Sequence, residues 1–259
     1  MIYIISYVDD FKIKKMIDKI KADKDTVFII GSGTSLNKVD ISKLKDCNTI
    51  SMNRQYIAYP EWGFTPTYYV IIDSKLIRTI HKDVEKLIKE EDIKKFFIMK
   101  HPDNSMTGWV DKMRLEESDR IVPVFASRRQ EILSKSIRSL ANKPINFCGN
   151  AGACSVEIAR HLGYKKVILL GIDAKYADRN DSIKAEKDLS HFHPNYFDVN
   201  TFKEGLNQGI HGENAGVRYW KKFSEQQVSI PDFEVISSSP DSPINEFLKY
   251  VEFEDLFVS

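Results

Sequence analysis

The sequence predicts an α/β protein built on a mostly parallel β-sheet. Short, continuous apolar runs such as 26–30 and 166–170 are typical of strands that are buried on both faces. Segments with apolar residues at helical spacing alternate with these runs, which is the pattern of βαβ units. Glycine or polar residues follow several of the runs directly. Because parallel sheets bind ligands at the carboxyl ends of their strands, these residues are the first candidates for a site.

Each expected element rests on a short local pattern. Strands are expected at 26–30, 48–52, 68–72, 96–99, 121–124, 166–170 and 233–236, and helices at 11–22, 76–89, 155–162 and 244–250. Pro123 has no N–H for a sheet hydrogen bond, so the strand that contains it is expected at an edge. A chain of 259 residues suits one domain that covers 1–259.

Composition limits the class of protein. Hydrophobic residues make up 42% of the chain, and the net charge of +1 gives no overall field that would hold a nucleic acid. The first residues lack the basic start and long apolar run of a signal peptide. No apolar run approaches the roughly 20 residues that cross a bilayer. We therefore expect a cytoplasmic protein with no membrane span and no nucleic-acid partner.

One long segment, 174–216, breaks the alternation of strands and helices. It is polar and aromatic, and its histidines are His191, His193 and His211. A loop of this length inside a compact domain is typical of a functional lid or of disorder. We expect a lid-like insertion within the single domain.

The turn Gly31-Ser32-Gly33-Thr34-Ser35 follows the first expected strand and is the main candidate for a binding loop. Glycines let a ligand approach the backbone closely, and hydroxyl side chains can cap a helix. Free backbone N–H groups in such a turn suit a phosphate or another anion. The motif is neither a Walker loop nor a complete GxGxxG. An ordinary tight turn between a strand and a helix is the competing interpretation.

Three further segments lie at strand ends or at a helix start. Asn53 follows the second strand and suits a ribose, a base edge or a sugar hydroxyl. The small residues Asn150, Ala151 and Gly152 precede a helix and form a second candidate site for an anion or a carbonyl. Asp173 ends a late strand and could hold a ligand hydroxyl, a cation or a neighbouring backbone group. Their structural alternatives are a turn asparagine, a closely packed loop and a helix N-cap.

His191 and His193 are the most suggestive polar pair in the lid-like segment. Histidine exchanges a proton near neutral pH, so each is a candidate general base. The pair also resembles half a metal site, but no HExxH or Cys/His spacing accompanies it, and no metal is expected. Two exposed loop histidines are the alternative interpretation.

Taken in order, these segments resemble the bacterial sialyltransferases of glycosyltransferase family 42. The similar stretches are 29–36, 53–56, 152–173 and the serine-rich 235–242. The resemblance implies a Rossmann-like, doubly wound sheet with helices on both faces, and a lid that closes over a cytidine-monophosphate sugar. The same core is shared with proteins related to the archaeal 6-hydroxymethylpterin diphosphokinases. A nucleotide held at the sheet edge is the implication common to both.

The resemblance also implies roles for single residues. Ser32 stands where the family has an asparagine that contacts the donor, and Asn53 matches the family's asparagine after the second strand. Tyr176 and Tyr196 are the candidates for the family's phosphate-binding tyrosines, and Cys148 replaces a family arginine. A lid histidine of the family acts as general base, and either histidine of the pair above is compatible with that role.

The leading hypothesis is a glycosyltransferase that moves a sugar from a CMP-type nucleotide donor to the hydroxyl of a glycan or small molecule. Backbone amides near Gly33 and Gly152 would stabilise the departing phosphate, and the lid would exclude water. No metal or other cofactor is implied, and related enzymes assemble as homo-oligomers. Two alternatives stay open. One is a diphosphokinase-like enzyme that transfers pyrophosphate from ATP with Mg²⁺ near Asp73 or Asp173. The other is a nucleotide-binding module without catalysis.

Overall fold

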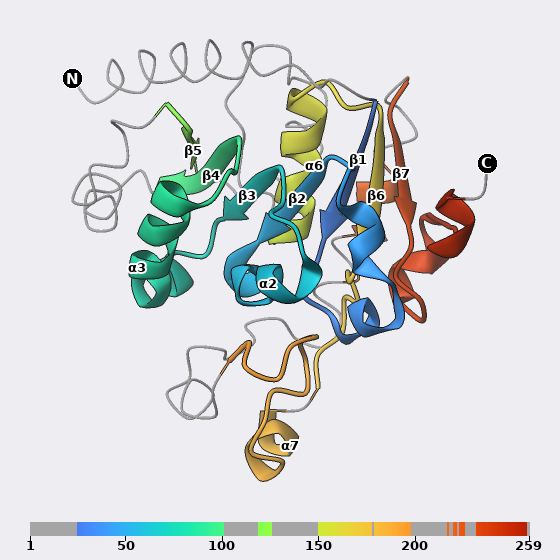
Figure 1. Cartoon of the computed structure of the whole chain (residues 1–259). Coiled ribbons are helices and arrows are strands. Elements are labelled where there is room, and N and C mark those ends of the chain that lie inside the picture. Colours follow the sequence, from blue (N-terminus) through green and yellow to red (C-terminus); the bar gives the residue numbers. More distant parts are fainter. Residues whose placement is uncertain are drawn as a thin grey trace, which may run out of the picture.

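The computed structural model describes residues 25–100, 119–125, 150–177, 179–197, 217, 220–221, 223–225 and 232–257, and the helix expected at 11–22 lies outside them. In the described residues, eight parallel strands form one sheet in the order β5-β4-β3-β2-β1-β6-β7-β8 (Figure 1). The strands are β1 (Thr26–Ile30), β2 (Thr49–Met52), β3 (Tyr68–Ile71), β4 (Lys95–Lys100), β5 (Ile121–Phe125), β6 (Lys166–Leu170), β7 (Glu234–Ser237) and β8 (Lys249–Tyr250). The prediction of a Rossmann-like α/β fold is confirmed.

Helices connect most of these strands. The described α-helices are α2 (Tyr59–Trp62), α3 (Ser74–Glu90), α6 (Ala151–His161) and α7 (Arg179–Lys184). Short 3₁₀ helices are η1 (Thr34–Lys38), η2 (Ile41–Leu44), η3 (Asn53–Ala58), η5 (Pro243–Glu246) and η6 (Glu254–Phe257). Helix α6 begins four residues before the expected 155, because Asn150 caps it by accepting a hydrogen bond from the Ala153 N–H at 2.8 Å.

The core lies on both faces of the sheet, as the continuous apolar runs predict. Along β1, Val27 and Ile29 pack with residues of α6, whereas Phe28 and Ile30 pack with residues of α2 and α3. Figure 1 shows α6 (yellow) on one face and α2 and α3 (blue to green) on the other. Because successive side chains of a strand point to opposite faces, a strand covered on both sides needs an unbroken apolar run.

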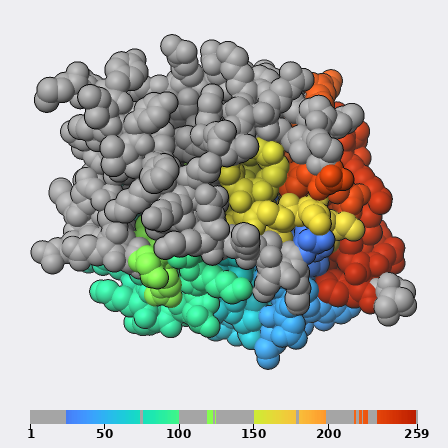
Figure 2. Space-filling view, turned by 90° about the horizontal axis from the view of Figure 1, so that it is seen from above, coloured from blue at the N-terminus to red at the C-terminus, as the bar shows by residue number. Residues whose placement is uncertain are grey.

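The two edges of the sheet differ from one another in how well they were predicted. Strand β5, which contains Pro123, is an edge strand as expected. Seen from above, β5 (green) and the C-terminal segment (red) lie on opposite sides of the molecule (Figure 2). The helix expected at 244–250 is wrong: this stretch forms η5 and then β8, and Lys249 pairs with Ile236 of β7. A run of seven residues is too short for its periodicity to separate a helix from a turn followed by a strand.

The order of the strands reverses beside β1. The chain runs outward from β1 through β2 to β5, and then returns to the other side of β1 with β6. Loops that follow β1 and β6 therefore depart in opposite directions from the same edge, which is where doubly wound folds bind ligands. No helix of the described residues is both long enough and apolar enough to cross a membrane.

Candidate functional site

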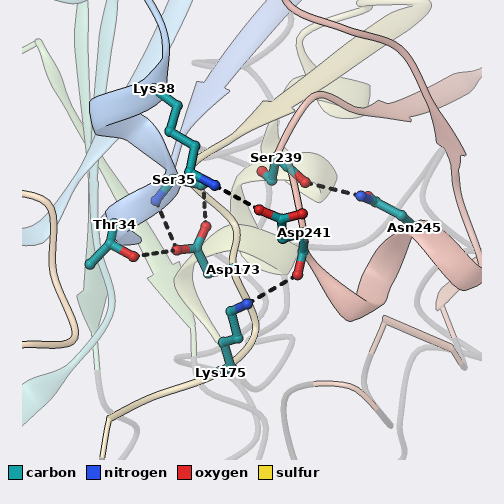
Figure 3. Close-up of polar contacts among 8 residues, drawn as sticks. All are labelled: Thr34, Ser35, Lys38, Asp173, Lys175, Ser239, Asp241 and Asn245. Atoms are coloured by element: carbon teal, nitrogen blue, oxygen red, sulfur yellow. Dashed lines mark hydrogen bonds and ion pairs between the residues drawn. The ribbon is translucent and has the colours of Figure 1, made fainter.

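A carboxylate closes the Gly31–Ser35 turn. Asp173 follows β6, the neighbour of β1, and its side chain reaches across to the turn (Figure 3). One oxygen, Oδ2, accepts hydrogen bonds from the Ser35 N–H at 3.0 Å and from the Thr34 hydroxyl at 3.3 Å. The other, Oδ1, accepts a hydrogen bond from the Ser35 hydroxyl. Asp173 is 6% exposed. Because its buried carboxylate accepts these three hydrogen bonds, it occupies the position that a bound anion would take at the turn.

The backbone of this turn offers fewer free N–H groups than the sequence indicated. The N–H groups of Gly31 and Gly33 donate to carbonyls at the end of β6, at 2.6 and 2.8 Å. The Leu36 N–H donates back into the turn at 3.1 Å, and the Ser35 N–H donates to the carboxylate described above. The expectation of free amides for a phosphate is wrong at these positions, because β6 and the residues that follow it already accept the hydrogen bonds.

Close packing explains the two glycines of the turn. A Cβ atom on Gly31 would lie 2.3 Å from the carbonyl oxygen of Gly171. A Cβ atom on Gly33 would lie 2.3 Å from the carboxyl carbon of Asp173. Both distances are shorter than real Cβ contacts, so the strand ends can approach each other only where side chains are absent.

The turn after β2 is held in place by a buried glutamine. Asn53 begins η3 with a φ of 54°, a left-handed value that asparagine tolerates better than most residues. The Nε2 of Gln55 donates to two carbonyl oxygens at the end of β1, at 2.7 and 2.6 Å, and its Oε1 accepts from the Met52 N–H at 2.8 Å. These bonds fix the backbone from which the side chains of Asn53 and Arg54 project.

Polar atoms of this second turn lack partners. The Oδ1 atom of Asn53 and the Nε atom of Arg54 are buried, and neither has a hydrogen-bond partner in the described part of the chain. The Arg54 guanidinium lies over the ring of Phe197, 5.7 Å from its centroid. An unpaired buried polar group costs about 1–3 kcal/mol, so buried polar atoms normally have partners. A ligand bound at this turn could supply the missing hydrogen-bond partners of these two atoms.

Residues of the lid-like segment pack directly on the glycine-containing turn. The Phe192 N–H donates to the Ser32 carbonyl at 3.0 Å, and the Asn37 side chain donates to the Phe192 carbonyl at 2.9 Å. The hydroxyls of Tyr196 and Ser32 share a hydrogen bond of 2.9 Å. In Figure 1 the segment that carries α7 (gold and orange) lies below the sheet, beside the loops that follow the strands.

Tyr196 connects this segment to the turn after β2. Burial raises the pKa of its hydroxyl to about 12, while hydrogen bonds from Ser32, the Arg54 backbone and the Asn53 side chain oppose that rise. The hydroxyl is therefore protonated at neutral pH and can act as a hydrogen-bond donor.

His191 is held in a defined orientation by a carboxylate and by aromatic rings. Its Nδ1 lies 2.7 Å from Oδ2 of Asp188, whose side chain is fully buried. Its ring stacks on Tyr196 at 4.2 Å between centroids and contacts the edge of Phe197 at 5.2 Å. Tyr176 lies 6.3 Å away and is exposed. With Nδ1 directed at the carboxylate, Nε2 is the nitrogen that a substrate can approach.

The second histidine of the pair has both ring nitrogens in use. The Nδ1 atom of His193 accepts the Asn195 N–H at 3.1 Å, and its Nε2 lies 3.2 Å from Oε1 of Glu61. Because Nδ1 accepts a hydrogen bond, the ring proton is on Nε2 and is donated to Glu61. This arrangement leaves no nitrogen of His193 ready to accept a proton from a substrate.

The small residues at the start of α6 allow the strand ends to pack closely against this helix. Asn150 is the N-cap of α6, and Ala151 and Gly152 form the start of the helix. A Cβ atom on Gly152 would lie 3.1 Å from Cδ1 of Ile172, the same atom that a Cβ on Gly31 would meet at 2.5 Å. Close packing, the alternative expected for this loop, accounts for Gly152, and the N-cap hydrogen bond accounts for Asn150.

Serines near the C-terminus fix the segment that precedes Asp173. The Ile172 N–H donates to the Ser239 hydroxyl at 2.9 Å, and the Ser242 hydroxyl donates to the Ile172 carbonyl at 2.8 Å. Lys38 pairs with Asp241 at 2.6 Å on the outer side of this network (Figure 3). The loops that follow β1, β6 and β7 are thereby joined into one support.

Sequence reasoning missed several residues that shape the site. Asp188 stands three residues before His191, and that spacing is the signal that a search for paired side chains would have used. Arg54 follows Asn53 directly but has no motif of its own. Gln55 gives no signal, because only the folded chain shows that its amide reaches β1.

The described residues contain no group of three or more His, Cys, Asp or Glu side chains placed to hold a metal ion. Of the two positions expected for Mg²⁺ under the diphosphokinase alternative, Asp173 has both oxygens in hydrogen bonds, and Asp73 accepts a hydrogen bond from the Leu76 N–H at 3.2 Å.

The fold is similar to two solved glycosyltransferase structures. One is the MAf glycosyltransferase from Magnetospirillum magneticum AMB-1, with a TM-score of 0.51 and 14% identity over 96% of this chain, which spans 38% of that protein. The other is the sialyltransferase CstII from Campylobacter jejuni in complex with a substrate analogue, cytidine-5′-monophosphate; its TM-score is 0.51 at 17% identity, over 88% of this chain and 86% of that one. Neither protein-family models nor curated protein sequences give a match. At these identities the likeness shows the fold.

Proposed function

We propose that the protein is a glycosyltransferase that moves a sugar from a nucleotide donor, of the CMP type, to an acceptor hydroxyl. The observation that carries the proposal is the oriented His191 beside the unpaired polar atoms of Asn53 and Arg54, at the sheet edge where doubly wound folds bind nucleotides. The likeness to two glycosyltransferases supports this choice among the nucleotide-binding functions.

Within this proposal, His191 is the general base. Asp188 directs the Nδ1 of His191, so the Nε2 can accept the proton of the acceptor hydroxyl. The acceptor oxygen then attacks the anomeric carbon, the bond from that carbon to the phosphate oxygen breaks, and the nucleotide leaves with the bonding electrons. His193 is not assigned this role, because its nitrogens bind Asn195 and Glu61.

The donor is expected at the turn after β2. Asn53 would bond the ribose or the sugar, and the protonated hydroxyl of Tyr196 would donate to a phosphate oxygen beside Ser32. The Gly31–Ser35 turn forms a wall of this site. The described part of the insertion expected at 174–216, which is 174–177 and 179–197, would cover the bound donor and limit hydrolysis; 178 and 198–216 lie outside the described residues. The sugar that fits the resemblance is a sialic acid, and the acceptor would be a glycan or a small hydroxyl compound.

The test is turnover of a panel of nucleotide sugars by the wild type, His191→Ala and His193→Ala. Removal of a general base lowers turnover by about 10²–10⁴-fold, so we expect a loss of that size for His191→Ala. The matched variant His193→Ala should retain turnover within about tenfold of the wild type. His211→Ala is measured beside them as the third histidine of the insertion. If His191→Ala turns over normally while His211→Ala does not, the assignment of the base is wrong.

A screen of thermal stability with cytidine, uridine, guanosine and adenosine nucleotides separates the alternatives. We expect cytidine monophosphate to raise the melting temperature selectively, since a ligand that binds the folded state stabilises it. Stabilisation by ATP that depends on Mg²⁺ would instead favour pyrophosphate transfer. Stabilisation by nucleotides without turnover of any donor would favour a binding module.

A further inference from the structure

We infer that Arg54 binds an anionic group of the ligand, either the phosphate of the nucleotide or the carboxylate of an acidic sugar. The inference rests on the proposed function for the kind of ligand, and on the described residues around Arg54 for the binding of an anion.

Arg54 projects from a fixed backbone at the edge where the strand order reverses. It is the second residue after β2, and the Gln55 side chain ties this turn to the end of β1 through two hydrogen bonds. A guanidinium on such a support loses little further freedom when it binds a ligand.

Among the described residues, no ion pair neutralises the charge of Arg54. No carboxylate of the described residues lies within ion-pair distance of its guanidinium, and its Nε is buried without a hydrogen-bond partner. The carboxylate of Asp83 accepts a hydrogen bond from the Tyr56 hydroxyl at 2.6 Å. Burial and Asp83 raise the pKa of Tyr56, and the positive charge of Arg54 opposes that rise.

Three other groups at this edge that could hold an anion, the Ser35 N–H, Lys38 and Lys175, already have partners within the described residues. Asp173 accepts the Ser35 N–H of the glycine-containing turn, and Lys38 pairs with Asp241. Lys175 donates to the carbonyl of Asp241 at 3.1 Å (Figure 3). A charged donor binds a phosphate more strongly than the neutral Tyr196 hydroxyl does alone, and Arg54 is placed to supply that charge.

The aromatic contact of Arg54 places an anion close to the proposed base. Its guanidinium lies over Phe197, and the ring of Phe197 also contacts His191 at 5.2 Å. With one face on an aromatic ring, the edge of the guanidinium stays available for the two-point hydrogen bonds that a carboxylate or phosphate accepts. An anion on that edge would be held near the position where the acceptor is deprotonated.

Calorimetric titration of the full chain with four probes tests this inference. The probes are CMP, cytidine, N-acetylneuraminic acid and inorganic phosphate, and the variants are Arg54→Gln and Arg54→Lys. The matched control is Arg120→Gln, since Arg120 also lies over an aromatic ring, Phe96 at 5.6 Å. Arg120 precedes the edge strand β5, so it lies at the amino ends of the strands, away from the turns after β1 and β2. Circular dichroism confirms that each variant is folded.

If Arg54 binds the phosphate, Arg54→Gln lowers the affinity for CMP by about 10–100-fold, because a hydrogen bond to a charged group contributes a factor of that size. The affinity for cytidine, which has no phosphate, stays unchanged. If Arg54 binds the carboxylate, Arg54→Gln lowers the affinity for N-acetylneuraminic acid and leaves the affinity for CMP unchanged. Arg54→Lys should retain part of the affinity in either case. Arg120→Gln should alter none of the probes.

The outcomes separate this inference from the proposed function. Suppose that the wild type binds CMP. If Arg54→Gln leaves the affinity for every anion unchanged, or lowers the affinity for cytidine as much as that for CMP, the inference is wrong and the proposed function stands. If the wild type binds no nucleotide but binds phosphate through Arg54, the proposed function is wrong and the inference stands. If the wild type binds none of the four probes, both are wrong.

Discussion

The turns after β1 and β2 lie at the same edge of the sheet, yet one is closed and the other is open. In the first, the chain's own Asp173 accepts hydrogen bonds from Ser35 and Thr34. In the second, Asn53 and Arg54 each have a buried polar atom without a hydrogen-bond partner in the described part of the chain. The glycine-containing turn has the more familiar motif, and the turn without glycine has the unused hydrogen-bonding capacity.

The difference follows from the neighbours of each strand. Strand β1 lies beside β6, so the residue that ends the β6 loop can reach the glycine-containing turn. Strand β2 lies between β1 and β3. The Gln55 side chain after β2 uses its hydrogen bonds to anchor the backbone. In this chain the glycines of the first turn are explained by close packing.

The largest effect is expected where the open turn meets the lid-like segment, in Asp188→Asn. An asparagine can donate to the Nδ1 of His191, which leaves the ring proton on Nε2 and removes the acceptor for the substrate proton. We expect turnover to fall by about 10³-fold with the substrate KM little changed. Steady-state kinetics on the folded variant measures both. A rise in KM at unchanged turnover would show that Asp188 only shapes the segment.

A large loss of stability is expected at the closed turn, in Gly31→Ala. The added methyl group would lie 2.3 Å from a backbone carbonyl oxygen that cannot move independently, so the unfolding free energy should fall by about 3 kcal/mol. Gly63→Ala is the matched control, since its φ of 72° is strained for alanine but no atom lies within 4 Å, and about 1 kcal/mol is expected. Urea unfolding compares the two. Equal losses would mean that the closed turn is not tightly packed.

A pH-dependent effect, no larger than that of Gly31→Ala, is expected at the buried titratable side chains of α6, away from both turns. Burial raises the pKa of Glu157 to about 7, although Arg160 opposes the rise, from an unfolded value of 4.5. Burial lowers the pKa of His161 to about 4. Between pH 4.5 and 7 the folded state holds the Glu157 proton more tightly than the unfolded state, so this part of the stability is lost as pH rises through that window.

The unfolding free energy of Glu157→Gln should therefore exceed that of the wild type by about 3 kcal/mol at pH 8, and by little at pH 4.5. The loss of stability from His161 as pH falls from 6.5 towards 4 should remain in both proteins. Urea unfolding across this pH range measures the difference, with CMP affinity as the control for the turns. A variant whose stability has the same pH profile as the wild type would exclude Glu157 as the source.

The sequence predicted the sheet well because each strand carries its own signal. A run such as 166–170 is apolar throughout, and only a strand covered on both faces needs that pattern. The C-terminal helix at 244–250 was wrong because seven residues hold too little periodicity, and pairing with β7 decided the outcome.

The site was harder to predict because its decisive contacts are long-range. Nothing in the sequence shows that Asp173 fills the turn 138 residues earlier, or that Glu61 engages His193 across 132 residues. The choice between the two histidines could therefore not be made before the chain was folded. Asp188 and His191 are the exception, since they are three residues apart.

The most direct test of the open and closed turns is an NMR titration of the ¹⁵N-labelled protein with CMP. The signals to follow are the Nε–H of Arg54 and the backbone N–H of Ser35. We predict that the Arg54 signal shifts as CMP binds, while the Ser35 signal stays in place because Asp173 retains its hydrogen bond. A large shift of Ser35 with no change at Arg54 would contradict this, and would place the phosphate on the glycine-containing turn.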